Sequence, residues 1–137
     1  MQAQILDLMN HLKEKRGTSI LLITHDLGVV AKMADRIAVM YLGKIVEIGP
    51  ATEVFHMPVH PYTKALMSAI PIPDPKEEKK KTRIPIEGEI PSPVNPKPGC
   101  RFAARCKYAT ELCRSETPKL EEMEEGHYVA CHRVKEI

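Results

Sequence analysis

The chain has 137 residues and contains no tryptophan, two phenylalanines and four tyrosines, so we expect an aliphatic core. Its hydrophobic fraction of 43% is near that of soluble proteins. No apolar run approaches the roughly 20 residues that cross a bilayer. The N-terminal segment MQAQILDLMN also lacks the basic region of a signal peptide. These absences predict a chain that is made and kept in the cytoplasm.

The chain also lacks a large net charge of either sign. The formal net charge is +2, which is too small to indicate a nucleic-acid partner. The basic run KEEKKK, at residues 76–81, is interrupted by two glutamates, so we interpret it as a solvated linker rather than a binding patch. We therefore expect no nucleic acid to bind.

Cysteine is missing from the first 99 residues, and the last 38 contain four, spaced C-x5-C-x6-C-x17-C. Clustered thiols in a chain without a secretory signal favour metal or cluster binding over disulfides. Zinc sites usually use C-x2–4-C knuckles, which do not occur here. An iron–sulfur cluster tolerates more varied loops, because its four thiolates need only converge. The spacing favours a cluster and leaves open zinc, two disulfides or four free thiols: Cys100, Cys106, Cys113 and Cys131.

Proline is scarce in the first half of the chain. Eleven of the twelve prolines lie at or after Pro58, and eight of those fall between Pro71 and Pro98. The chain thus changes character near residue 70. We predict three parts: an α/β domain over 1–70, a proline-rich linker over 71–99, and a cysteine-rich extension over 100–137. The core of that extension is too small to fold without a cross-link or metal.

Periodicity and capping residues predict five short helical segments. An apolar stripe runs over residues 1–12, with Gly17 as the stop. Asp26 is placed to cap a helix that ends at Met33, and Thr52 a turn through Phe55. The remaining segments are a helix over residues 62–70 with a proline at its start, and a short helix within residues 102–107.

Three strands are expected, the first of them the unbroken apolar run of residues 20–23. A run of that kind is typical of a strand buried on both faces of a parallel sheet. Residues 36–41 and 44–48 form two further strands joined by a turn at Leu42-Gly43. The triplet Thr24-His25-Asp26 would then lie at the carboxyl end of the buried strand, where α/β sheets place ligand-binding groups. A histidine there can donate a hydrogen bond to a phosphate oxygen.

Three segments resemble known families. The stretch LLITHDLGVVAKMADRIAVMYLGKIVEIGP is similar to the region around the switch histidine of ABC-transporter ATPases. The following VFHMPVHPYTKALMSAIP resembles the region after the core in the peptide-transporter branch. The segment GEIPSPVNPKPGCRFAARC and the later cysteines resemble the C-terminal extension of ATP-binding subunits of dipeptide, oligopeptide and nickel importers. Together these resemblances cover nearly the whole chain.

The resemblance implies an α/β fold: the C-terminal part of a P-loop NTPase sheet, with the switch-histidine loop, followed by a small irregular cysteine-rich extension. It also implies an ATP-binding subunit that couples ATP hydrolysis, with Mg²⁺, to peptide uptake. Such a subunit lies on the inner face of the cell membrane. Its partners are transmembrane permease subunits and a second ATP-binding subunit.

The same resemblance assigns site residues. His25 matches the switch histidine that contacts the γ-phosphate, and Asp26 matches the acidic residue after it, which we interpret as a cap. The four cysteines match those that hold a [4Fe–4S] cluster in some members of the family. Three nearby side chains are placed to hydrogen-bond the cluster or offset its charge, or are simply solvated: Arg101, Arg105 and His132.

The chain departs from the family in having no G-x-x-x-x-G-K-[ST] loop, no signature loop and no strand ending in Asp-Glu. We therefore expect it to be the C-terminal portion of a subunit, without ATPase activity by itself. The alternative is a stand-alone iron–sulfur interaction or redox module. Uncovered apolar surfaces predict a homodimer or larger assembly that buries four side chains between copies: Ile5, Leu8, Ile20 and Leu22.

Overall fold

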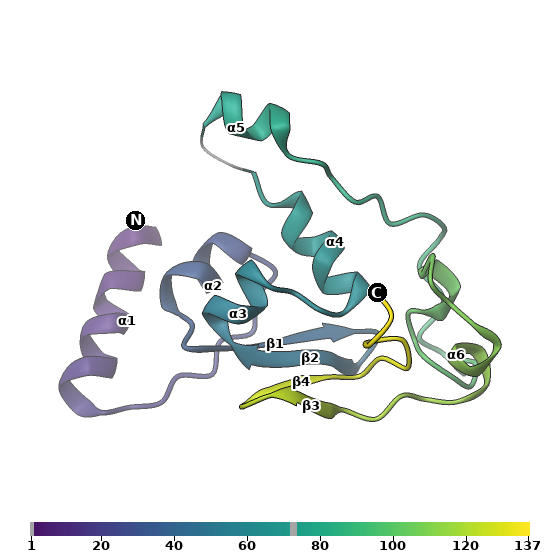
Figure 1. The fold of residues 1–137 in the computed structure, drawn as a ribbon. Coiled ribbons are helices and arrows are strands. Elements are labelled where there is room, and N and C mark those ends of the chain that lie inside the picture. Colours follow the sequence, from purple (N-terminus) through teal and green to yellow (C-terminus); the bar gives the residue numbers. More distant parts are fainter. Residues whose placement is uncertain (1, 72–73) are drawn as a thin grey trace. The chain divides into compact units, whose positions relative to one another are not determined.

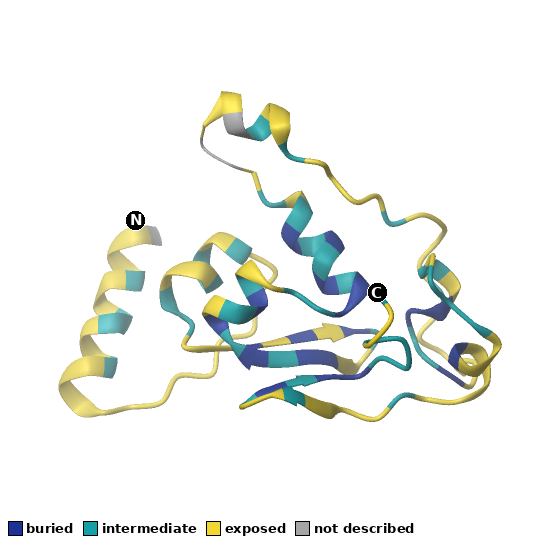
Figure 2. Cartoon of the chain, viewed as in Figure 1, coloured by how far each residue is buried: buried dark blue, intermediate teal, exposed yellow. Residues whose placement is uncertain are grey.

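The computed structural model describes residues 2–71 and 74–137. It divides the chain into two compact units, Met1–Asp35 and Arg36–Ile137. The first unit is largely exposed, and most of the buried residues belong to the second, as Figure 2 shows. No described helix is both long enough and apolar enough to cross a membrane.

The first unit contains the helices α1 (Gln2–Arg16) and α2 (Leu27–Met33). The predicted stop of α1 is confirmed, because Gly17 follows it with a φ of +59°. The predicted cap of α2 is also confirmed. The Asp26 carboxylate accepts hydrogen bonds from the backbone N–H groups of Gly28, at 2.9 Å, and Val29, at 3.1 Å.

The strand predicted over residues 20–23 is wrong. These residues form neither helix nor strand, and the side chains of Leu21 and Ile23 are 91% and 90% exposed. A strand needs a hydrogen-bonded neighbour, and no described strand pairs with this segment. An apolar run without a partner strand therefore stays extended. The predicted association between copies stays a prediction for its four residues: Ile5, Leu8, Ile20 and Leu22.

The second unit is built on a four-stranded antiparallel sheet with the order β1-β2-β4-β3 (Figure 1). The predicted hairpin is confirmed as β1 (Arg36–Tyr41) and β2 (Lys44–Pro50). Positive φ angles at both turn residues match a type I′ turn. A parallel sheet was expected around residues 20–23, and the sheet that the second unit forms is antiparallel.

The expectation of an irregular C-terminal extension also needs correction. The extension forms β3 (Glu121–Glu124) and β4 (His127–Val129), and β4 pairs with β2. Sequence reasoning missed these strands because β4 has only three residues, too few for an alternation to be recognised. The tail thereby becomes part of the same sheet as the first predicted domain, while the domain boundaries at 70/71 and 99/100 stay a prediction.

Short helices complete the second unit. The predicted helix over residues 62–70 is confirmed with Pro61 at its start, whereas Thr52 lies inside its helix and does not cap it. The run expected to be a solvated linker contributes to a helix, because the Asp74 carboxylate accepts a bond from Lys76 N–H and caps it. The bounds are α3 (Ala51–His56), α4 (Pro61–Ala69), α5 (Pro75–Lys80), the 3₁₀ helix Ala103–Arg105 and α6 (Glu111–Ser115).

The core of this unit is not purely aliphatic, as the low aromatic content had suggested. One face of β1 buries Ile37, Val39 and Tyr41. The Tyr41 ring packs edge-to-face on Tyr62, at 4.8 Å, and on Phe102, at 5.2 Å between centroids. Three of the six aromatic residues thus join β1, α4 and the cysteine-rich segment.

We expect Gly99→Ala to lower the free energy of unfolding by about 3 kcal/mol. Gly99 has a φ of +94°, and an added Cβ would lie 2.5 Å from the carbonyl oxygens of Cys113 and Arg114. Gly43→Ala is the matched control, since Gly43 has a φ of +75° with nothing within 4 Å, so it costs about 1 kcal/mol. Urea unfolding followed by circular dichroism measures both losses, and equal losses would contradict the close approach.

Candidate functional site

His25 occupies an exposed bend directly before α2. The backbone N–H of Asp26 donates to Thr24 Oγ1 at 3.0 Å, so the two flanking side chains are engaged in local turn and cap bonds. Among the described residues, the imidazole of His25 makes no hydrogen bond or ion pair. The side chain is therefore presented to solvent, and its contact with a phosphate stays a prediction.

The four cysteines come from separate places in the chain and line one small cavity of about 20 Å³. Cys100 and Cys106 flank the 3₁₀ helix, Cys113 lies in α6, and Cys131 follows β4. All four are free thiols, so the alternative of two disulfides is not what the structure contains. Binding of a metal or cluster by these four residues stays a prediction.

Backbone bonds hold the cysteine loops together. The N–H of Cys100 donates to the carbonyl of Cys113 at 2.7 Å. This bond joins the first cysteine to the third, which lies in α6. The N–H of Ala103 donates to the carbonyl of Cys100 at 3.0 Å, at the start of the 3₁₀ turn. Gly99 allows this close approach because only glycine fits its positive φ beside two carbonyl groups. The loop geometry therefore brings the thiols together through main-chain contacts.

The environment of these thiols is unfavourable to isolated negative charge. Burial raises the pKa of Cys100, Cys106 and Cys131, and neighbouring cysteines raise it further. A backbone N–H two residues after each of the three works in the opposite direction, and lowers the pKa by stabilising the thiolate. The raised pKa values favour the neutral thiol at these three cysteines. A nearby positive charge, such as that of a metal centre, would favour the thiolate instead.

The described residues include no group of three or more His, Cys, Asp or Glu that could hold a metal ion. Zinc draws four ligands to about 2.0–2.3 Å from one centre, so its sulfur atoms must lie within roughly 4 Å of one another. The cysteine cavity is therefore not arranged as a single-ion zinc site.

The three charged neighbours predicted from the sequence are engaged with backbone carbonyls. Arg101 Nη1 donates to Lys97 at 3.4 Å, Arg105 Nε to Glu87 at 3.3 Å, and His132 Nε2 lies 2.9 Å from the carbonyl of Glu116. Of the three, only His132 lines the cavity. Their main observed contacts hold loops, and nothing here links Arg101 or Arg105 to the thiols.

Sequence reasoning missed Arg133, which does line the cavity. Its Nη2 pairs with Glu136 at 2.7 Å, while its Nε is buried and has no hydrogen-bond partner among the described residues. A buried N–H without an acceptor is uncommon in folded proteins. Nothing in the sequence around Arg133 indicated that its side chain would line the cavity.

His60 is a second cavity residue that the sequence did not single out. It is 1% exposed and lines the cavity beside Phe102, with ring centroids 5.8 Å apart. Its Nδ1 accepts a bond from Tyr62 N–H at 3.1 Å and so caps α4. Burial lowers its pKa to about 4, so the ring is neutral at physiological pH and its proton lies on Nε2.

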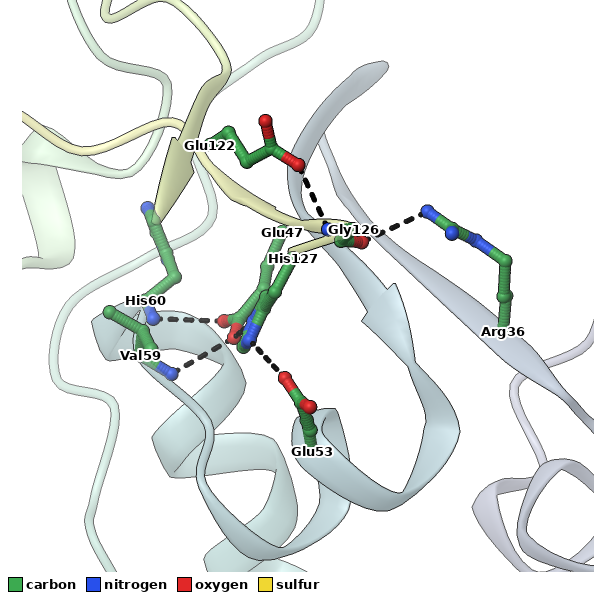
Figure 3. Close-up of polar contacts among 8 residues, drawn as sticks. All are labelled: Arg36, Glu47, Glu53, Val59, His60, Glu122, Gly126 and His127. Atoms are coloured by element: carbon green, nitrogen blue, oxygen red, sulfur yellow. Dashed lines mark hydrogen bonds and ion pairs between the residues drawn. The ribbon is translucent and has the colours of Figure 1, made fainter. Parts of the chain in front are cut away.

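A buried carboxylate connects this region to the sheet. Glu47 of β2 has no exposed surface, and it accepts backbone bonds from Val59 N–H at 2.9 Å and His60 N–H at 2.8 Å. His127 of β4 contacts the same carboxylate through Nε2 at 2.8 Å, and its Nδ1 lies 3.2 Å from Glu53 of α3. Figure 3 shows the Glu47 carboxylate bonded to the backbone N–H of His60 and to the ring of His127, with Glu53 on the other side of that ring. We call these four residues the Glu47 cluster.

The Glu47 cluster could be suspected from sequence only in part. Glu47 is a charged residue between the apolar Val46 and Ile48 of β2, which is a weak signal. Its partners lie 12, 13 and 80 residues away, so the pairing depends on the fold. Close packing supports the arrangement, because a Cβ on Gly49 would lie 2.9 Å from the ring of His127.

We expect Glu47→Gln to lower the free energy of unfolding by about 2–3 kcal/mol. The amide must turn its NH₂ group toward at least one of three N–H donors, which leaves that buried donor without an acceptor. Glu121→Gln, on the exposed face of β3, is the control and should change stability by less than about 0.5 kcal/mol. Thermal and urea unfolding measure both, and an unchanged stability in Glu47→Gln would refute the cluster's role.

A family model described as oligopeptide/dipeptide transporter, C-terminal region, matches residues 46–113. This range contains Glu47, His60 and three of the four cysteines. The oligopeptide transport ATP-binding protein of Escherichia coli is 50% identical over 134 residues, which are 98% of this chain and 40% of that protein. The corresponding proteins of Salmonella typhimurium and Haemophilus influenzae are 49% and 47% identical, with the same coverage of both chains. The chain thus spans about 40% of the length of these curated relatives.

Proposed function

The chain belongs to the oligopeptide/dipeptide transporter family, and we propose that it acts as the C-terminal portion of the ATP-binding subunit of a peptide importer. The observation that carries the proposal is identity of about half to oligopeptide transport ATP-binding proteins over nearly the whole chain. In this role it works with ATP and Mg²⁺. Its partners are permease subunits and a second ATP-binding subunit, at the inner face of the membrane.

The 137 residues hold only part of what ATP hydrolysis needs. They contain no G-x-x-x-x-G-K-[ST] loop to surround the phosphates with backbone N–H groups. We propose that hydrolysis occurs only where such a loop is present with this chain, and that the 137 residues do not hydrolyse ATP on their own.

We assign His25 the part of a positioned donor toward the γ-phosphate. The residue is exposed at the start of a segment that the Asp26 cap holds in place, so its imidazole is accessible to a ligand. A donor at that position stabilises charge that develops on the phosphoryl oxygens during transfer.

In the complete transporter, His25→Ala should reduce the ATP turnover number by about 100-fold or more while ATP binding is retained. This pattern follows if the histidine acts on the transition state rather than on bound ATP. His11→Ala, at an exposed position of α1 in the same unit, is the matched control and should leave turnover unchanged. Steady-state phosphate release measures the turnover number, and equilibrium ATP binding measures the affinity for ATP. Equal turnover in the His25→Ala and His11→Ala variants would contradict the assignment.

We further propose that the four cysteines hold a [4Fe–4S] cluster. Convergence of four free thiols on one cavity supports it, as do the three backbone N–H groups that favour thiolate. The buried Arg133 Nε without an acceptor also fits an anionic group. The bound cluster would supply cross-links between the loops, and we assign it a structural role.

Anaerobic purification of the full chain should yield brown protein with about four irons per chain. Replacing any one of the four cysteines by serine should remove most of the iron and the visible absorbance, because a corner ligand is lost. Ser115→Ala lies in the same helix as Cys113 but outside the cavity lining, and should retain the iron. Colourless anaerobic protein with one zinc per chain would refute the cluster.

A further inference from the structure

The residues that line the cysteine cavity include two that each carry a side-chain N–H group for which the described residues supply no acceptor. One is Arg133 Nε, which is buried. The other is Nε2 of His60, a residue that is 1% exposed. The hydrogen bonds of His60 among the described residues involve its backbone and its Nδ1, so Nε2–H takes part in none of them. A buried donor without an acceptor destabilises a fold, so Arg133 Nε at this cavity indicates a missing acceptor, and the unpaired Nε2–H of His60 is a second donor available to it.

We propose that His60 and Arg133 donate hydrogen bonds to sulfur within this cavity, and thereby position and tune the cluster that the four cysteines hold. The inference rests on the cluster of the proposed function. Cluster sulfides and cysteine thiolates are anionic acceptors, and N–H donors beside them stabilise the more negative, reduced state. His60 supplies a neutral donor and Arg133 a charged one.

The placement of both donors is fixed from outside the cavity. The backbone N–H of His60 donates to Glu47, and its Nδ1 is taken by the α4 cap, so the ring has a single orientation. The Nη2 of Arg133 is held by Glu136. By contrast, Arg101 and Arg105 donate to carbonyl groups and do not line the cavity. The two proposed donors are thus positioning residues, and the Glu47 cluster sets the position of the first.

Substitutions at His60 can separate its two functions. In His60→Asn the amide oxygen can replace Nδ1 as the cap of α4, while the donor at the place of Nε2 is lost. In His60→Gln the longer side chain returns an N–H group to the place of Nε2. Arg133→Lys keeps the positive charge and removes the Nε donor. Because Arg133 is partly exposed, this variant is expected to fold even if changes at the fully buried His60 do not.

The experiment uses the full chain, purified anaerobically, with iron and sulfide analysis followed by a redox titration monitored by electron paramagnetic resonance. We expect His60→Asn and Arg133→Lys to keep their iron and to show at least a threefold lower ratio of reduced to oxidised cluster at a fixed potential. His60→Gln should stay within twofold of the wild type. A merely structural role would alter iron content or thermal stability without this ordered change in the reduced fraction.

Two results would overturn the inference, and they are distinguishable. If both His60→Asn and Arg133→Lys hold a cluster that titrates as the wild type does, these residues are not donors to it, while the cluster itself stands. If the wild-type chain takes up no iron under anaerobic conditions, the cluster proposal fails and the inference fails with it.

Discussion

A carboxylate with no exposed surface is stable only when its charge and its oxygen atoms are matched by donors, and Glu47 finds such donors only in the folded chain. Two of them are consecutive backbone N–H groups before α4, and the third is a histidine of the C-terminal hairpin. One side chain of β2 therefore fixes both the start of α4 and the position of β4. Much of the arrangement of residues 36–137 depends on this contact.

The cysteine cavity is linked to the same constraint. His60 is bound to Glu47 through its backbone, caps α4 through one ring nitrogen, and borders the thiols with the remainder of the ring. Phe102, between the first two cysteines, packs on Tyr41 of β1. The cysteine-rich segment is thus anchored on the sheet by an aromatic contact and a buried polar contact.

Local patterns predicted what depends on local contacts. The strand-like runs of residues 36–41 and 44–48 and the Leu42-Gly43 turn predicted the β1–β2 hairpin, and Asp26 predicted the start of α2. The clustering of the four cysteines within 38 residues made a common location plausible, and all four line one cavity. The family itself was predicted from three sequence segments, and the similarity to oligopeptide transporter proteins confirms it.

Features that depend on distant partners could not be predicted. The run of residues 20–23 has the composition of a buried strand, but composition cannot show whether a neighbouring strand is present. Glu47 and His127 are 80 residues apart, and neither has a local feature that selects the other. The proposed role of Arg133 depends on an unpaired buried nitrogen, which is a property of the packed structure.

The most direct test of this account is amide hydrogen exchange in the full chain at Val59 and His60. These two N–H groups donate to the buried Glu47 carboxylate, so we predict that they exchange only through global unfolding, as slowly as amides in the β1–β2 ladder. Exchange at Val59 and His60 as rapid as that of the exposed residues 20–23 would show that the carboxylate does not hold the fold together.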